Sequence, residues 1–217
     1  YIDRYESLKQ LWQQFEKNWT PPPEEKSRSI YQPYLVSSTG TGRVAVAYGR
    51  HEESALQVWS GEWGYPGDGR YLEFHKKHFP GGHRYWRVTS AKADLADKQE
   101  YVPENVEEAL ENQSDHFVEV LRNYILKYYA ESGKIGVVTA PFDTELFGHW
   151  WFEGPRWLGK VLRKINANPD IQAISLGNHL AKNRPTQVVT MPEGSWGQGG
   201  FHYIWLNQWT EWTWKHI

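Results

Sequence analysis

The chain has 217 residues, which is long enough for a domain with a substantial hydrophobic core. Its 24 basic and 26 acidic residues nearly balance, which argues against a nucleic-acid partner bound by neutralising phosphates. It has no cysteine to form a disulfide and no apolar run near the ~18 residues of a membrane span. We therefore expect a cytoplasmic protein with no nucleic-acid or membrane partner.

The chain begins with a helical pattern and continues with short strands. Apolar residues at helical spacing predict a helix over residues 1–18. Three consecutive prolines exclude a helix interior or a central strand from residues 20–29, so a solvated loop is expected there. Apolar, β-branched runs then predict strands at 34–36 and 44–48, joined by a glycine-rich turn at 38–42.

The segment that follows carries the first candidate site residues. Arg50 lies at the end of the second strand, where its guanidinium can pair with a carboxylate on the floor of a cleft. Trp59 ends a short predicted helix, shortly before a turn rich in glycine. The pattern predicts, in order, a helix at 55–59, a tight turn at 64–68, a helix at 68–78 and a strand at 85–89.

The longest helix is predicted over residues 103–132, after a polar loop at 92–102. Its apolar residues recur at helical spacing, and Gly133 follows where a glycine commonly ends a helix. The helix leads by a crossover into residues 135–140, whose β-branched run predicts a buried parallel strand. Alternating strands and helices of this kind predict an α/β fold with a mostly parallel sheet.

Acidic residues stand just beyond this strand, beside a cluster of aromatic residues. A proline ends the strand because it has no N–H to donate, and Asp143 and Glu145 follow. In α/β barrels, catalytic groups come from the carboxyl ends of the strands. The rings of Phe147, Trp150 and Trp151 are expected to desolvate Asp143, which would raise its pKa, and to offer faces for sugar rings.

Two simpler interpretations of this loop remain open. Asp143 can cap the helix that follows, beside an aromatic core, because a perturbed carboxyl marks a site only in a statistical sense. Asp143, Glu145 and His149 could also bind a metal ion, but their spacing fits no standard ligand motif. We therefore expect neither a metal nor another cofactor.

Aromatic residues gather again near the C-terminal end. The preceding elements are predicted to be a helix at 152–167, a strand at 170–176, a helix or turn at 176–183 and a strand or extended segment at 186–191. The loop at 193–200 is rich in glycine, which lets backbone approach a ligand, and it presents Trp196. Trp205 follows closely. Three further tryptophans recur at helical spacing and are expected in a core or an interface: Trp209, Trp212 and Trp214.

Three long motifs, in this order, resemble those of glycoside hydrolase family 57, and in particular its α-1,4-glucan branching enzymes. They are VWSGEWGYPGDGRYLEF at 58–74, FDTELFGHWWFEGP at 142–155 and MPEGSWGQGGFHYIWLNQWTEWTW at 191–214. The resemblance implies a (β/α)7 barrel followed by a helical domain. Residues 1–190 would supply the later part of the barrel, and residues 191–217 the glycine- and tryptophan-rich loop and the start of the helical region.

The resemblance also implies roles for individual residues. Asp143 stands at the position of the family's general acid/base, and Trp59 at that of a tryptophan that lines the active site. The remaining substrate-binding candidates are Trp196, Trp205, His149, Trp150 and Arg50. The expected substrate is an α-1,4-glucan such as amylose or glycogen, and the expected reaction is a retaining transglycosylation that forms α-1,6 branches. The 13 tryptophans of the chain agree with a carbohydrate ligand, because their ring faces can stack on sugars.

A retaining mechanism needs a second carboxylate, and no stretch before Asp143 matches the family motif that carries the nucleophilic glutamate. Glu145 is close in sequence, but two residues along an extended segment its carboxyl would lie beside that of Asp143 instead of across the bond. We expect the nucleophile, with the N-terminal part of the barrel, to be absent from this chain. The chain alone would then be inactive. The alternatives are an α-amylase or a 4-α-glucanotransferase of the same family, or a non-catalytic α-glucan-binding module.

Overall fold

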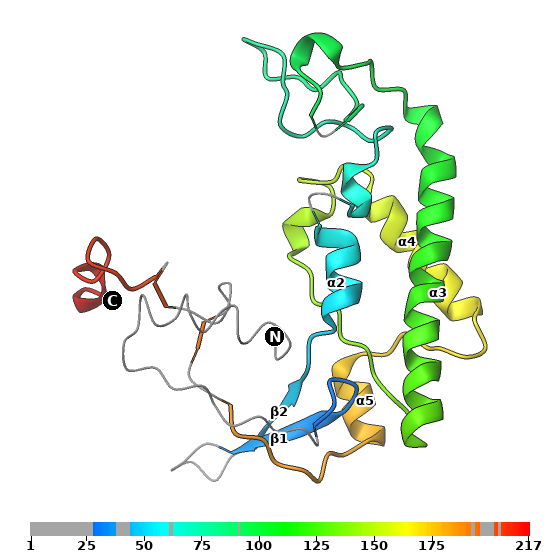
Figure 1. The fold of residues 1–217 in the computed structure, drawn as a ribbon, viewed down its shortest axis with the longest axis vertical. Helices are drawn as coiled ribbons and strands as arrows, with labels where there is room; N and C mark the ends of the chain where they lie inside the picture. Colours follow the sequence, from blue (N-terminus) through cyan, green and yellow to red (C-terminus); the bar gives the residue numbers. More distant parts are fainter. Residues whose placement is uncertain are drawn as a thin grey trace. The chain divides into compact units, whose positions relative to one another are not determined.

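The computed structural model describes residues 28–37, 44–60, 63–90, 92–191, 194–195, 202–203 and 205–217. It divides into two compact units. The larger unit comprises Ser29–Leu35 and Val46–Gln187, and it holds the helices α2 to α5 (Figure 1). The described parts of the smaller unit include Val188 to Met191 and the C-terminal residues 205–217. The predicted N-terminal helix lies outside the described residues.

The two predicted N-terminal strands are confirmed. Strand β1, Pro33–Ser37, pairs with strand β2, Val44–Tyr48, in a two-stranded sheet. The turn predicted between them lies outside the described residues. Residues 186–191, predicted as a strand or an extended segment, form no regular strand. The amide of Leu35 donates to the carbonyl of Gln187 at 2.8 Å.

The central segment at 135–140 is parallel to its neighbour, but the prediction of a buried strand is wrong. Arg50 and Thr139 form a single parallel bridge, and the amide of His51 donates to the carbonyl of Thr139 at 2.8 Å. Ile135 is 74% exposed, and the residues that follow it are only half-buried. Among the described residues this segment pairs at isolated points, so no continuous ladder forms and its apolar side chains keep access to solvent.

Helix α2, Glu52–Trp59, starts at His51, whose imidazole accepts a hydrogen bond from the amide of Ser54. His51 is buried, and its Nε2 lies 3.0 Å from the hydroxyl of Tyr31. Its ring also packs edge-on against Tyr124 of α3, with 4.4 Å between centroids. Burial lowers the pKa of His51, so the neutral ring serves as the cap.

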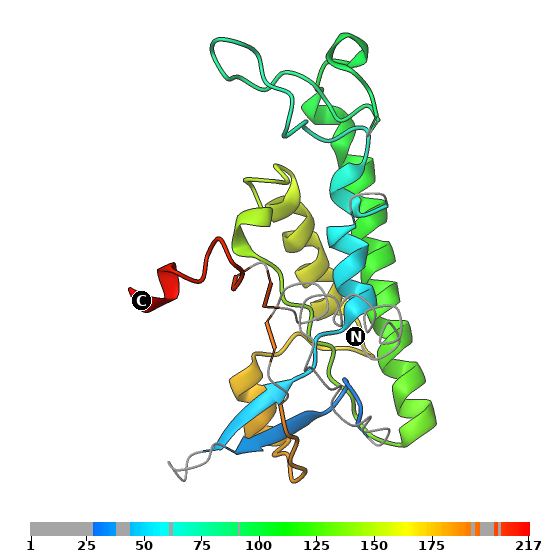
Figure 2. The ribbon, with the colours of Figure 1, turned by 60° about the vertical axis from the view of Figure 1, so that its left-hand side comes forward.

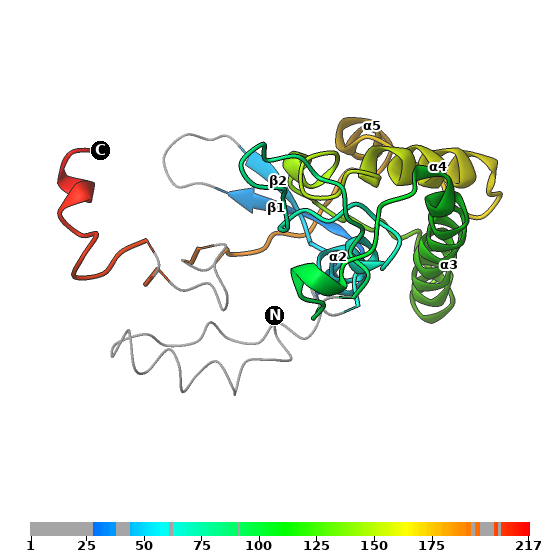
Figure 3. The same cartoon turned by 90° about the horizontal axis from the view of Figure 1, so that it is seen from above.

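Helix α3, Glu107–Ser132, confirms the long predicted helix, with a short 3-10 turn, Pro103–Val106, before it. Gly133 ends it at φ 68°, a conformation that glycine adopts at low cost, and its amide donates to the carbonyl of Tyr129. Helices α2 and α4, Gly154–Ala167, pack beside α3 (Figures 2 and 3). Helix α5, Leu176–Lys182, is short and begins at the capping hydroxyl of Ser175.

The core of the larger unit lies where α2, α3 and α4 meet. Trp157 on α4 is fully buried, and its ring lies 5.0 Å from Phe117 of α3 and 5.2 Å from Trp151, which precedes α4. Tyr71 is also fully buried and lies 5.6 Å from Trp151. Such clusters gain both from the apolar area removed from water and from tilted ring contacts.

The prediction of a helix at 68–78 is wrong. Leu72 forms an antiparallel bridge with Arg87, and the amide of Glu73 donates to the carbonyl of Trp86 at 2.9 Å. Tyr71 and Glu73 are buried while Leu72 between them is half-buried, the two-residue period of an extended chain. The segment predicted as a strand at 85–89 is therefore extended and pairs irregularly with residues 71–73. We call these two paired segments the ribbon.

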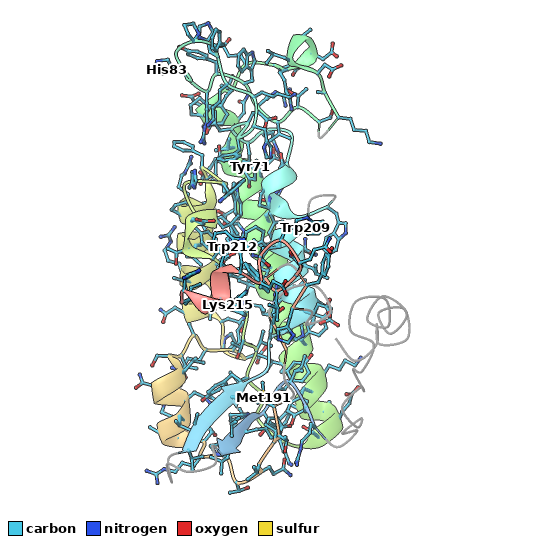
Figure 4. All side chains as sticks on the ribbon, turned by 90° about the vertical axis from the view of Figure 1, so that its left-hand side faces the viewer. Tyr71, His83, Met191, Trp209, Trp212 and Lys215 are labelled. Carbon is cyan, nitrogen blue, oxygen red and sulfur yellow. The ribbon has the colours of Figure 1, made fainter. Side chains whose placement is uncertain are left out.

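The prediction of a strand at 170–176 is wrong, and within the described residues Trp209 and Trp212 do not lie in a core. Residues 171–175 form no strand, since no described segment offers backbone groups to pair with them. Trp209 and Trp212 lie in turns before a short 3-10 helix, Thr213–Lys215, and are 63% and 62% exposed (Figure 4). The helical spacing of these tryptophans therefore marks no buried face within the described residues.

Replacing Trp157 with alanine should lower the free energy of unfolding by ~3–5 kcal/mol, because it empties the centre of the core. Urea unfolding of the wild type and the variant measures this loss. Leu162 is 48% exposed on the same helix, so Leu162→Ala is the matched control and should cost about 0.5 kcal/mol or less. Equal losses in the two variants would contradict the assigned core.

Candidate active site

Asp143 lies directly after the segment that runs parallel to the end of β2. The bridge between Arg50 and Thr139 aligns the two segments, so Asp143 and the start of α2 follow from the same edge. Asp143 occupies the position before a 3-10 turn, Thr144–Leu146, yet its side chain makes no capping hydrogen bond. The interpretation of Asp143 as a helix-capping residue is therefore wrong, and its exposed carboxyl is available for other roles.

The loop after Asp143 is a compact turn closed by its own backbone. The amides of Trp150 and Trp151 donate to the carbonyls of Glu145 and Leu146 at 3.2 and 2.8 Å. Gly148 sits at φ 97°, where a side chain would be strained. The indole N–H of Trp150 also donates to Oε1 of Glu145 at 3.2 Å. This turn therefore fixes Trp150 and Glu145 relative to each other.

The aromatic residues of this loop do not enclose Asp143 as predicted. Trp151 is 1% exposed and belongs to the core, and Phe147 stacks on Trp157 with 6.4 Å between centroids. Trp150 alone of the three predicted rings is exposed, at 40%. Trp151 and the half-buried Phe147 serve packing, so of these three rings Trp150 is the one that can contact a ligand.

The buried carboxyl of this motif is Glu153, which the sequence analysis missed. Glu153 is fully buried at the start of α4, and its Oε1 accepts a hydrogen bond from the amide of Leu72 at 3.1 Å. Burial raises the pKa of Glu153, and the hydroxyl of Tyr101 offsets this in part. The sequence signal was a lone carboxyl between Phe152 and the glycine–proline pair that opens a helix.

Arg50 lies just before helix α2, and Trp59 is the last residue of that helix. Arg50 is exposed, and among the described residues no carboxylate forms an ion pair with its guanidinium. Trp59 ends α2 with its ring 38% exposed. His149 is exposed as well, and its carbonyl accepts a hydrogen bond from Nη1 of Arg84 at 3.3 Å. The larger unit thus holds Asp143 together with four of the residues that are predicted to contact the substrate.

The remaining predicted contacts lie elsewhere or outside the described residues. Trp196 lies outside them. Trp205 belongs to the smaller unit, is 38% exposed and lines a mostly apolar cavity of about 380 Å³. The other residues that line this cavity are Ser195, His202, Leu206 and Trp214.

The larger unit also has a polar cavity of about 550 Å³ that contains none of the predicted site residues. Arg70 and Arg87 line it, but Arg70 is paired with Asp68 and Arg87 donates to the carbonyl of Gly69. We therefore do not place the active site there. No group of three or more histidine, aspartate or glutamate side chains in the described residues could hold a metal ion. Within the same residues no helix is long and apolar enough to cross a membrane.

Known proteins resemble this chain in sequence. No family model matches the chain. The chain is 39% identical over 194 residues to a 1,4-alpha-glucan branching enzyme of Thermococcus kodakarensis, which covers 89% of this chain and 28% of that protein. It is 36% identical over 178 residues to a probable 1,4-alpha-glucan branching enzyme of Mycobacterium tuberculosis, covering 80% of this chain and 34% of the relative. The chain thus spans about a third of the curated relatives it matches.

Solved structures agree with these relatives. A GH57 branching enzyme from Thermococcus kodakaraensis, in complex with glucose and additives, matches with a TM-score of 0.79 at 37% identity, over 90% of this chain and 35% of that one. The GH57-type branching enzyme of Pyrococcus horikoshii gives 0.78 at 41% identity, over 86% and 34%. The alpha-amylase AmyC of Thermotoga maritima gives 0.71 at 29% identity, over 86% and 37%.

Glu153→Gln should make stability less dependent on pH. The pKa of Glu153 is raised in the folded state, so the stability it contributes is present at low pH and is lost as pH rises through the folded value. Glutamine is neutral throughout, so the variant should gain on the wild type as pH rises from the ordinary glutamate pKa of 4.5 into the neutral range. Urea unfolding across this range measures the difference.

Glu104 is exposed, so Glu104→Gln is the control and should run parallel to the wild type. A wild type that instead gained on Glu153→Gln as pH rose would overturn the raised pKa.

Proposed function

We propose that this chain, homologous over about nine tenths of its length to enzymes of glycoside hydrolase family 57, belongs to the catalytic region of a 1,4-α-glucan branching enzyme. The observation that carries this is the match to two solved GH57 branching enzymes, at 37% and 41% identity with TM-scores of 0.79 and 0.78. The substrate would be an α-1,4-glucan, and the product a glycogen-like glucan with α-1,6 branches. We place this glycogen synthesis in the cytoplasm.

The proposed fold is the later part of a (β/α)7 barrel. Support comes from the parallel bridge between Arg50 and Thr139 and from α3, which leads back to the segment that ends at Asp143. Residues 1–190 would belong to the barrel, and residues 191–217 would form its glycine- and tryptophan-rich loop and the start of a helical region. The N-terminal part of the barrel would be contributed by residues outside these 217.

The proposed chemistry is a retaining transfer in two steps. A carboxylate nucleophile from the part of the barrel outside these residues attacks the anomeric carbon, while Asp143 protonates the leaving glycosidic oxygen. Asp143 then removes the proton from the 6-hydroxyl of an acceptor glucan as that oxygen attacks the anomeric carbon and displaces the nucleophilic carboxylate. Glu145 is a poor nucleophile here, since it lies in the same turn as Asp143 and accepts the indole N–H of Trp150.

Tryptophans would hold the sugars and exclude water, which separates transfer from hydrolysis. In the larger unit these are Trp59 and Trp150, both partly exposed. Trp205 and Trp196 would act from the C-terminal loop. Arg50 and His149 would supply hydrogen bonds to sugar hydroxyls.

The second candidate is an α-amylase, favoured by the structural similarity to AmyC at a TM-score of 0.71. Its identity of 29% is below the 37% and 41% of the branching enzymes, so branching is the better-supported reaction. A 4-α-glucanotransferase and a non-catalytic glucan-binding module are the remaining alternatives. The first would give unbranched products and the second none, so an assay for branches distinguishes both from branching.

Asp143→Asn in the complete polypeptide should reduce branching of amylose by ~100-fold or more, because the group that moves the proton is lost. Binding of maltoheptaose should stay within about twofold, since charge loss leaves the sugar contacts in place. Iodine staining and isothermal titration calorimetry measure the two quantities. Asp97 is exposed at the end of a 3-10 turn, Leu95–Asp97, so Asp97→Asn is the matched control. Full branching activity of Asp143→Asn would refute the assignment of Asp143 as the general acid/base.

The 217-residue chain alone should neither branch nor hydrolyse amylose. Loss of the nucleophile of a covalent mechanism removes several orders of magnitude of rate, whatever else remains. Iodine staining and reducing-end release from the purified chain provide the measurement. Turnover by this chain that disappears in Glu145→Gln would identify Glu145 as the nucleophile and refute the proposed division of the site.

A further inference from the structure

Phe74 lies between the exposed ring of the candidate active-site loop and a cation. One face of Phe74 packs on Trp150, with 4.3 Å between ring centroids and 35° between the planes. The guanidinium carbon of Arg84 lies 4.7 Å from the Phe74 centroid, and Nζ of Lys77 lies at 5.5 Å. Ring pairs and cation–π contacts of this kind stabilise one arrangement of the partners.

Arg84 is attached to the same loop by a second contact. Its Nη1 donates to the carbonyl of His149 at 3.3 Å, and the ring of His149 lies 5.4 Å from that of Phe74. Phe74 and Arg84 therefore contact two consecutive residues of the loop, one through a ring face and one through the backbone.

Buried contacts of the preceding residues fix the position of Phe74. The preceding residue, Glu73, pairs with Nζ of Lys98 at 2.5 Å, and both side chains are almost fully buried. The amide of Glu73 donates a hydrogen bond to the carbonyl of Trp86, so the backbone at Phe74 cannot shift without breaking the ribbon. Two residues earlier, the amide of Leu72 is bonded to Glu153, where the loop ends and α4 begins. Phe74 is thus fixed relative to the end of the candidate site at which α4 begins.

Trp150 connects Phe74 to the turn that follows Asp143. Its indole N–H donates to Glu145, two residues beyond Asp143, and its ring remains 40% exposed. Because Phe74 covers one part of the ring, the exposed part has a defined direction. A sugar that stacks there would be oriented by Phe74 without touching it.

We propose that Phe74, supported by Arg84, is a positioning residue that sets the glucan-binding face of Trp150. This inference rests on the proposed function, since it assigns a glucan to that face. It predicts that loss of the Phe74 ring weakens glucan binding only as long as Trp150 is present. Phe74→Tyr keeps the ring and should keep the effect.

The test is a double-mutant cycle in the complete polypeptide carrying Asp143→Asn, which permits binding without turnover. Maltoheptaose binding is measured by isothermal titration calorimetry for Phe74→Ala, Trp150→Ala and the pair. Phe74→Ala should weaken binding about three- to tenfold, as expected for loss of one ring contact. In the Trp150→Ala background the same change should have an effect of less than about twofold. Phe74→Tyr should bind within about twofold of the parent.

Phe79→Ala is the matched control, because Phe79 is 91% exposed in the same segment and should leave binding unchanged. Melting temperatures of all variants report any general loss of structure. Equal effects of Phe74→Ala with and without Trp150, or no effect in either background, would refute the positioning role while leaving the proposed function intact. A parent protein that binds no maltoheptaose would refute the proposed function and the inference together.

Discussion

The packing of Trp157 against α3 and of Trp151 against Trp157 is the interaction on which the arrangement of the larger unit depends. Trp151 precedes α4 and Trp157 lies one turn into it, so their shared burial fixes where that helix begins. The neighbour of Trp151, Trp150, is directed to solvent because Gly148 allows the backbone to turn sharply. Of these two consecutive rings, Trp151 stabilises the fold and Trp150 remains accessible to a ligand.

Electrostatics outside this core supplement the packing without replacing it. Lys160 and Lys164 of α4 donate to Glu111 of α3 and lower its pKa to about 2. The side chain of Glu111 is 47% exposed, so water screens these pairs and each contributes little to stability. The buried pair of Glu73 and Lys98 is different in kind, since removing one partner would leave a charge without compensation. The ribbon therefore has a rigid base, although it has few regular hydrogen bonds.

Periodicity predicted what depends on local sequence, and failed where distant segments decide. Helices α2, α3 and α4 and the left-handed Gly133 follow from apolar spacing and terminal residues. The segment at 68–78 has apolar residues at both helical and alternating positions, and only its pairing with Arg87 and burial of Glu73 determine the extended form. The exposure of Asp143 and the burial of Glu153 depend on which face meets the core, and no residue type in the motif specifies that.

The ribbon also determines where this fold can change. The chain between Glu73 and Trp86 leaves and returns at a closed base, because these two residues are hydrogen-bonded to each other. Lengthening such a closed excursion costs little, since the entropy of loop closure grows only slowly with length. An insertion here would leave α3 and α4 undisturbed, yet it would alter what surrounds Trp150. This excursion is therefore where evolution, or a designer, could change what Trp150 contacts without rebuilding the scaffold.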